Sequence, residues 1–187
     1  HSLGSLVALE AASRAPERAT HLLMLGTCVP MPVPQALLDL SLTDVNAAID
    51  RVVMFSFSTL AAKPAYPGPG VWLRGSSRAL MRQVMAHGGD ARLFHTDFGA
   101  CNDYKNGLDA ARRITCPSHL VLAEADQMTF PRSAREVAAL LKARVHTVPG
   151  AGLLQLQERW AQLVTARFIQ HSRFDPMHAA ATEQQLY

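Results

Sequence analysis

The stretch of sequence that decides the fold is SHLVLAEADQMTFPRSAREVAALLKARVHTV, residues 118–148. Its first part, residues 118–123, is mostly apolar and predicts a strand, residues 131–142 predict a helix, and residues 145–148 predict a second strand. A further helix is predicted over residues 158–170. Strands that alternate with helices run parallel, because the helix carries the chain back across the sheet. This order is therefore typical of the α/β class, with helices packed on a parallel sheet.

The start of the chain shows the same kind of pattern. Residues 3–12 (LGSLVALEAA) predict a helix that is apolar on nearly all sides and is therefore expected to be buried. Residues 21–25 (HLLML) predict a buried parallel strand that ends at Gly26. Three prolines at positions 30, 32 and 34 follow, and no convincing buried strand is found in the next seventy or so residues. The middle of the chain therefore reads as a helical insertion.

The insertion is expected to contain two helices joined by a loop. The first is predicted over residues 44–57 and the second from about residue 76 to Gly88. Residues 63–70 between them are rich in Pro and Gly and predict a loop. At the other end of the chain, residues 174–187 have no periodicity and predict a loose tail. The candidate N-terminal caps are Thr43 or Ser41 for the first helix and Ser76 or Ser77 for the second.

Composition excludes several classes of protein. With 187 residues, 49% hydrophobic and 18% charged, the chain suits one globular domain. The net charge is +3 and the basic residues are scattered, so no nucleic-acid partner is predicted. No apolar run approaches the ~18 residues of a membrane helix, so no membrane partner is expected. Cys28, Cys101 and Cys116 lack C-x-x-C spacing and predict free thiols in a reducing, cytoplasmic compartment.

No metal and no cofactor are predicted from the sequence. The nearest approach to a metal motif is the group His95, Asp97, Cys101 and Asp103. Its spacing matches no tetrahedral ligand pattern, so we expect these residues to serve other purposes.

The first four residues carry the clearest chemical signal. His1-Ser2-Leu3-Gly4 directly precedes the predicted helix and matches the right-hand part of G-x-S-x-G, a turn that lifts a serine hydroxyl above a sheet. A strained turn from strand to helix needs small neighbours, and a helix N-terminus offers backbone N–H groups to a developing oxyanion. The alternative is a serine that simply caps the helix.

The chain resembles the α/β-hydrolase family in the order of its parts. HSLGSLVALEAASRAPERATHLLMLGT resembles the nucleophile elbow, the following helix and the next strand. HLVLAEADQMTFPRSAREVAALL resembles the later strand, acid loop and helix, and VHTVPGAGLLQLQERW resembles the last strand and the histidine loop. The resemblance implies an incomplete α/β-hydrolase fold with this division: 1–29 elbow, helix and strand of the core; 30–105 helical lid; 106–172 C-terminal part of the core; 173–187 tail.

The resemblance also implies roles for particular residues. Ser2 matches the nucleophile, and the backbone N–H of Leu3 matches one oxyanion-hole donor. Asp126 matches the acid and follows a predicted strand, at the carboxyl edge where active sites of such sheets assemble. Glu124 is the weaker candidate for the acid. A turn cap before the next helix is the alternative for Asp126.

The family's histidine is missing. The family's loop ends in Gly-x-Gly-His, whereas this sequence reads Gly150-Ala151-Gly152-Leu153. Leucine accepts no proton, so Ser2 and Asp126 alone are not a working triad. None of the other histidines is predicted to replace it; those weighed are His1, His21, His87, His95, His119 and His146.

The chain also lacks the strands that precede the elbow in the family, and it starts at His1 rather than Met. We therefore expect a truncated sequence, one that associates with the missing N-terminal half or with a second copy. The main functional hypothesis is a hydrolase that acts on an ester or related acyl bond of a small apolar molecule, impaired by Leu153. The alternatives are a non-catalytic ligand-binding relative and a non-functional fragment.

Overall fold

The structure is a computed structural model that describes residues 1–57, 72–88 and 90–172. The side chains of residues 153–159, 168 and 172 are outside this description, as are the predicted loop at 63–70 and the predicted tail at 174–187. The elements in chain order are α1 (Leu3–Arg14), η1 (Pro16–Arg18), β1 (Leu22–Leu25), α2 (Gln35–Thr43), α3 (Val45–Phe55), α4 (Leu73–His87), α5 (Leu93–Asp103), α6 (Gly107–Arg113), β2 (Ser118–Ala123), η2 (Pro131–Ala134), α7 (Arg135–Leu140), β3 (Arg144–Val148) and α8 (Leu153–Ser172).

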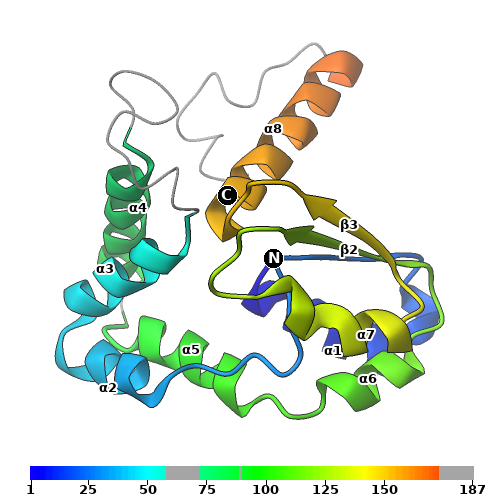
Figure 1. The fold of residues 1–187 in the computed structure, drawn as a ribbon, viewed down its shortest axis with the longest axis horizontal. Helices are drawn as coiled ribbons and strands as arrows, with labels where there is room; N and C mark the ends of the chain where they lie inside the picture. Colours follow the sequence, from blue (N-terminus) through cyan, green and yellow to red (C-terminus); the bar gives the residue numbers. More distant parts are fainter. Residues whose placement is uncertain (58–71, 89, 173–187) are drawn as a thin grey trace.

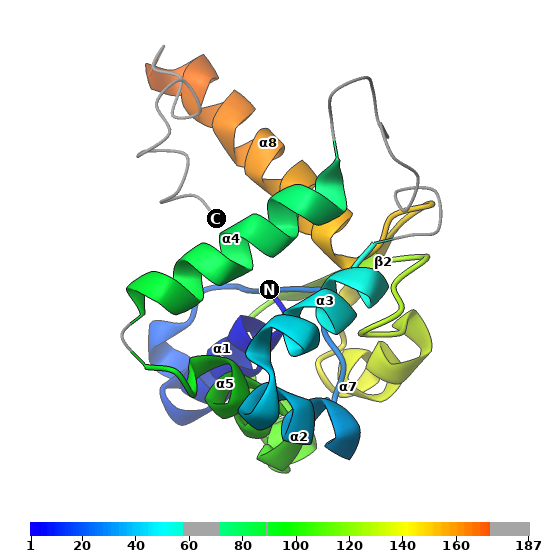
Figure 2. The same cartoon turned by 90° about the vertical axis from the view of Figure 1, so that its left-hand side faces the viewer.

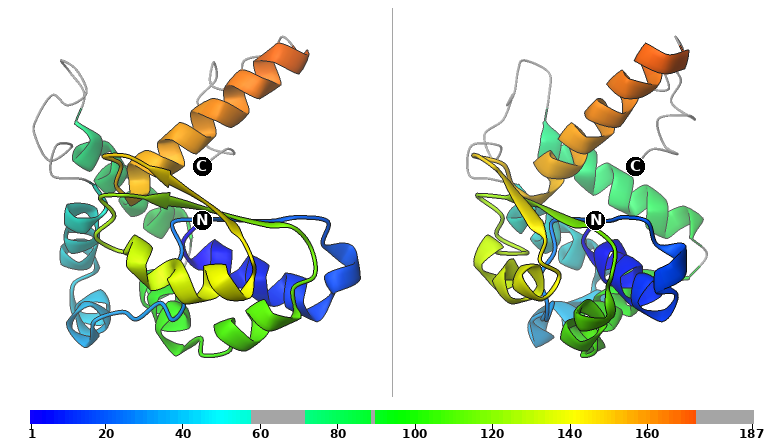
Figure 3. Two further views of the ribbon diagram at one scale, coloured as in Figure 1. Left: turned by 45° about the vertical axis from the view of Figure 1, so that its right-hand side comes forward. Right: turned by 90° about the vertical axis from the view of Figure 1, so that its right-hand side faces the viewer.

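The three described strands form one parallel sheet in the order β1-β2-β3. In its register Leu22 lies opposite Ser118, and Leu120 lies opposite Val145. Helices α1, α6 and α7 lie together on one face, while α8 rises from the other (Figures 1 and 3). The prediction of an α/β fold with parallel strands and flanking helices is therefore confirmed.

The main core lies between the sheet and the helices α1, α6 and α7. Successive side chains of a strand point to opposite faces, so Met24 and Leu120 both reach this core and are fully buried. Leu9 from α1 and Val137 from α7 meet them there, also without exposed surface. Burial of these side chains stabilises the layer by roughly 1.5–3 kcal/mol each relative to exposure.

A second hydrophobic cluster joins helices α2 to α5. Its buried members include Ile49 and Val53 from α3 and Phe94 from α5. Phe94 also stacks on Phe98, with ring centroids 4.6 Å apart. The four helices lie together near the carboxyl ends of the strands (Figures 1 and 2). In open parallel sheets this is the edge beyond which ligands bind.

Several helix starts differ from the predictions. Asp44 caps α3, its Oδ1 accepting from the Ala47 N–H at 3.0 Å, and neither Thr43 nor Ser41 does so. Both hydroxyls belong to α2 and bond back to its own carbonyls. The next helix, α4, begins at Leu73 rather than at Ser76 or Ser77. Serine and threonine inside a helix commonly turn their hydroxyls to the preceding turn, which makes them poor markers of its start.

Three other segments also depart from expectation. The predicted helix over 131–142 is a 3₁₀ turn followed by the short α7, and α8 begins at Leu153 instead of 158. Helix α1 is not buried on all sides, because Val7 is 61% exposed while Leu6 and Leu9 are buried.

In the described part of the chain, no helix is both long and apolar enough to cross a bilayer.

Candidate active site

Ser2 lies in a strained turn between the sheet and helix α1. Its backbone has φ 47° and ψ −125°, a region that residues other than glycine rarely adopt. The Ser2 N–H donates to the carbonyl of Leu25 at the end of β1, at 3.0 Å. Although Ser2 is in the N-cap position of α1, its hydroxyl makes no capping hydrogen bond. The hydroxyl is therefore not committed to the helix.

The buried hydroxyls of Ser5 and Thr27 support this turn. Ser5 Oγ lies 2.6 Å from the Ser2 carbonyl oxygen and 2.6 Å from Thr27 Oγ1. Ser5 is 1% exposed and Thr27 is fully buried, so both hydroxyls need these partners. The pair connects the turn to the loop that follows β1. The sequence pattern alone gave no sign of this contact between Ser5 and Thr27.

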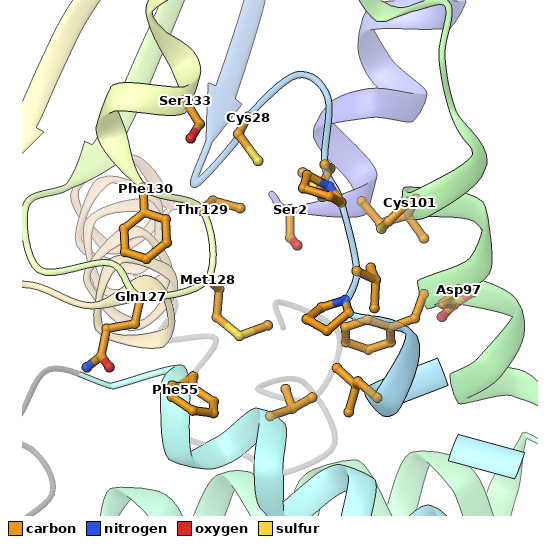
Figure 4. Close-up of a pocket in the computed structure, with 18 of the residues that line it drawn as sticks. Ser2, Cys28, Phe55, Asp97, Cys101, Gln127, Met128, Thr129, Phe130 and Ser133 are labelled. Atoms are coloured by element: carbon orange, nitrogen blue, oxygen red, sulfur yellow. The ribbon is translucent and has the colours of Figure 1, made fainter. Parts of the chain in front are cut away.

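An apolar cavity of about 620 Å³ opens beside Ser2. Figure 4 shows the Ser2 hydroxyl pointing into it, with Met128 and Phe55 on its walls. Among the described lining residues, the ionisable groups apart from the cysteines are Arg51 on α3, Asp97 on α5 and His1. The remaining lining residues are Leu3, Cys28, Met31, Pro32, Val33, Pro34, Ala36, Leu37, Val52, Phe98, Cys101, Gln127, Thr129, Phe130 and Ser133.

Asp126 lies directly behind this cavity wall. It is 2% exposed and is not among the lining residues, whereas its neighbours Met128 and Thr129 are. Its Oδ1 accepts from the Met128 and Thr129 N–H groups, both at 2.8 Å, and its Oδ2 accepts from Thr129 Oγ1 at 2.7 Å. Burial raises the pKa of the Asp126 carboxyl, and the hydrogen bonds from Thr129 and Met128 oppose this rise. Asp126 thus shapes the turn that forms the wall.

The other acid, Glu124, holds the loop that precedes α8. Its Oε2 accepts from the Gly150 N–H at 2.9 Å, and Gly150 has φ 65°, which suits glycine. The Ala125 N–H donates to the Ala151 carbonyl at 2.9 Å, so the acid turn and this loop are joined. Leu153 follows as the first residue of α8, and its side chain is outside the described residues.

The histidines are dispersed over the fold. His95 Nδ1 lies 2.9 Å from Ser41 Oγ, so this ring ties α5 to α2, and His87 Nδ1 contacts the Gln83 carbonyl of its own helix. Among the described residues, His1 is the histidine that lines the cavity, and its Nε2 is buried without a hydrogen-bond partner. His21 is exposed at the entry to β1. His119 and His146 contact each other on the sheet.

Two cysteines of the cavity wall have thiol groups whose pKa values are raised. Burial, with the nearby Asp126 and Cys101, raises the pKa of the Cys28 thiol to about 12. Burial and the nearby Asp97 raise the pKa of Cys101 to about 11. Since the thiolate is the nucleophile, neither thiol is activated at neutral pH. In the parts of the chain that the structure describes, no group of three or more potential metal ligands was found.

Comparison with known proteins agrees with this geometry. The family model described as "Alpha/beta hydrolase family" matches residues 1–166. The chain therefore belongs to the alpha/beta hydrolase family, as the resemblance predicted. No curated protein sequence matches the chain.

Solved structures share the fold at low sequence identity. A thermophilic esterase has a TM-score of 0.68 and 20% identity over 91% of this chain and 64% of its own. The enol-lactonase from Burkholderia xenovorans LB400 has a TM-score of 0.66 and 18% identity over 91% of this chain and 64% of its own. A putative non-heme bromoperoxidase BpoC from Mycobacterium tuberculosis H37Rv has a TM-score of 0.62 and 21% identity over 89% of this chain and 63% of its own. The chain thus spans less than two thirds of the length of these neighbours.

Proposed function

We propose that this chain is the serine-bearing part of a hydrolase that acts on an ester or related acyl bond of a small apolar molecule. The observation that carries the proposal is the Ser2 hydroxyl, held in a strained turn and directed into an apolar cavity (Figure 4). A volume of about 620 Å³ falls in the usual range for small-molecule pockets. The esterase and lactonase neighbours agree with this class of substrate.

In the proposed reaction, Ser2 Oγ attacks the acyl carbon and the carbonyl oxygen becomes an oxyanion. The Leu3 N–H stands in the first turn of α1, where N–H groups have no partner inside the helix, and it receives this charge. The role proposed for Asp126 is to orient a histidine imidazole at the position of Leu153, where such a base would take the Ser2 proton and pass it to the leaving group. Water then releases the acyl group from Ser2 and regenerates the hydroxyl.

We further propose that this activity is impaired in the chain as it stands. Leu153 occupies the family's histidine position, and a hydrocarbon side chain can neither take the proton of Ser2 nor return it. Removal of the base from such a triad typically costs several orders of magnitude in turnover. The proposal therefore places Ser2 in an acyl-transfer site that has lost its proton acceptor.

Hydrolysis of p-nitrophenyl butyrate tests the proposal. The protein is expected to turn over slowly, and Leu153→His to raise kcat/KM by at least about a hundredfold. Adding Ser2→Ala to Leu153→His should remove the gain, and Leu163→His, at an exposed site of the same helix, is the matched control. A fluorophosphonate that adds its mass to Ser2 only in the Leu153→His protein would support the same conclusion. Hydrolysis that is unchanged by Ser2→Ala would refute it.

A second candidate function is non-catalytic binding of an apolar ligand. The observation that favours it is the state of Asp126, whose two oxygens already accept three hydrogen bonds from its own turn. Calorimetric titration with N-butyl butanamide, an uncleavable amide, tests it. Met128→Trp should abolish binding by filling the cavity, whereas Leu80→Trp, on the exposed side of α4, should not. Binding with no gain of turnover in Leu153→His would favour this function over the first.

The remaining predictions about partners keep the status of proposals. We propose a small apolar molecule as the principal partner, and association with a second copy or with an N-terminal half as the further one. Sedimentation of the purified chain, alone and mixed with such a half, measures both kinds of association. The cytoplasmic compartment also stays a prediction.

A further inference from the structure

Two histidines from neighbouring strands meet on the face of the sheet opposite to α1, α6 and α7. In the register, His119 of β2 lies opposite Arg144, and His146 of β3 lies opposite Val121. The two histidines are therefore diagonal neighbours on one face, because side chains alternate along each strand. Leu120, the next residue of β2 after His119, points to the opposite face of the sheet and into the main core.

The two rings meet edge to edge. His119 Nδ1 lies 3.2 Å from His146 Nε2, and the ring planes differ by 8° with centroids 5.5 Å apart. One nitrogen donates its hydrogen to the other, which accepts it. The described structure gives neither ring any other hydrogen-bond partner. The pair is thus a self-contained unit of two imidazoles held by hydrogen-bonded strands.

We propose that His119 and His146 form a two-histidine site for a divalent first-row transition metal such as Cu²⁺, Ni²⁺ or Zn²⁺. Imidazole nitrogen is a preferred ligand of these ions. With metal–nitrogen bonds of about 2.0–2.1 Å, two ligands at tetrahedral or right angles stand about 2.9–3.4 Å apart. The observed separation of 3.2 Å falls within this interval. The centroid separation of 5.5 Å puts both nitrogens on the line between the rings. Each ring therefore has to turn by roughly 40° before both lone pairs point to one ion at metal–nitrogen distances of about 2.0–2.1 Å.

Metal binding at this pair needs no net loss of protons. For two neutral imidazoles, the accepting ring already offers its inner lone pair, and the donating ring frees its own when its hydrogen moves to the outer nitrogen. His146 is exposed and His119 is half-buried, so the ion has access from solvent. Because both residues stand in paired strands, their backbones are already positioned, and little order has to be created on binding.

The surroundings predict a modest affinity. In the described part of the chain no third histidine, cysteine or carboxylate joins the pair in a metal-holding group, so water would complete the coordination. Arg144, opposite His119, is exposed and adds a positive charge that opposes the cation. Affinity is expected to be highest for Cu²⁺, which heads the stability order for nitrogen ligands.

This site is independent of the proposed hydrolase function. Neither His119 nor His146 lines the cavity beside Ser2. Failure of one proposal therefore leaves the other standing.

Calorimetric titration of the whole chain with CuCl₂ and with ZnCl₂ at pH 7.5 tests the site. We expect one ion per chain, with affinity at least about tenfold weaker in His119→Gln and in His146→Gln, since glutamine can hydrogen-bond but is a poor ligand. The matched control is His87→Gln, because His87 is exposed and contacts its own helix alone. His1→Ser is the second control, because a terminal amine with an imidazole is itself a chelator.

The outcomes separate clearly. Binding that is weakened by both glutamine variants and kept by both controls supports the site. Binding that persists in His119→Gln and His146→Gln, or is lost in His1→Ser, overturns it, as does the lack of saturable binding in the parent chain. Thermal melts of the variants show whether they fold, and because His146 is exposed, His146→Gln is expected to melt as the parent does.

Discussion

Glu10 on α1 is predicted to be the main polar clamp between the serine-bearing helix and the α5–α6 junction. Its Oε2 accepts from Tyr104 Oη at 2.7 Å and from Asn106 Nδ2 at 2.8 Å, and its Oε1 pairs with Arg14 Nε at 2.7 Å. These contacts, led by Tyr104, lower the pKa of Glu10 from its ordinary 4.5 to about 2. We expect Glu10→Gln to destabilise the fold at neutral pH.

The size of the effect follows from the partners. A half-buried hydrogen bond to a charged group is worth about 1.5 kcal/mol, which applies to Tyr104 and Asn106. The Arg14 pair lies within one helix and Arg14 is 75% exposed, so it adds only about 0.3–0.5 kcal/mol. Glutamine keeps one acceptor oxygen, so the expected fall in the free energy of unfolding is about 2 kcal/mol at pH 7.

Urea unfolding between pH 7 and pH 3 measures this effect and its pH dependence. A carboxyl whose pKa is lowered by folding stabilises the protein fully above its unfolded pKa, and this contribution is lost as the pH falls toward the folded value. The window for Glu10 is thus from about pH 4.5 down to about pH 2. The difference between the parent and Glu10→Gln should shrink to about half at pH 3.

Glu17→Gln is the matched control, because Glu17 is an exposed carboxylate in the neighbouring 3₁₀ turn and makes no side-chain hydrogen bond in the described structure. It removes the same charge and should change stability by less than about 0.5 kcal/mol. A loss in Glu10→Gln that is equal at pH 7 and pH 3, or no larger than in the control, would refute the clamp.

Three further outcomes are expected. At pH 8, iodoacetamide should modify Cys116 well before Cys28 or Cys101, whose pKa values are raised to about 12 and about 11, as peptide masses would show. Asp44→Ala should lower the free energy of unfolding by about 1 kcal/mol in urea, because it removes the cap of α3. Thr27→Val should cost about 1–2 kcal/mol in the same assay, and Thr27→Ser should recover most of it, because the hydroxyl under the serine turn is restored.

Much of the core fold was predictable from local patterns. The strands over residues 22–25 and 118–123 were found because buried parallel strands are short apolar runs between turn residues. The start of α4 was placed wrongly, because Ser76 can cap a helix or lie inside it. The first turn of α4 contacts α3 through Arg74, whose Nη2 donates to the Met54 carbonyl at 3.2 Å, and no local pattern contains this contact.

The residues of the candidate site were named from the sequence, and their roles stay predictions, whereas their arrangement was not predicted. Ser2 and Leu3 line one cavity, as a motif at the start of a helix suggests. The structure alone showed that Asp126 lies behind Met128 and Thr129 and that its Oδ1 accepts hydrogen bonds from both of their N–H groups. It also showed that Glu124 serves the Gly150 loop, although both acids follow the same strand.

Local sequence patterns predicted the α/β class and offered a strained serine turn or a simple cap, and the sequence shows leucine rather than histidine at position 153. These depend on periodicity, on residue size and on chemistry, which are local properties. Only the tertiary structure decided which side chains share a space: the Ser5–Thr27 support, the cavity wall and the contact between His119 and His146. Each joins residues more than twenty positions apart, and their meeting depends on strand register and helix packing, which no short segment encodes.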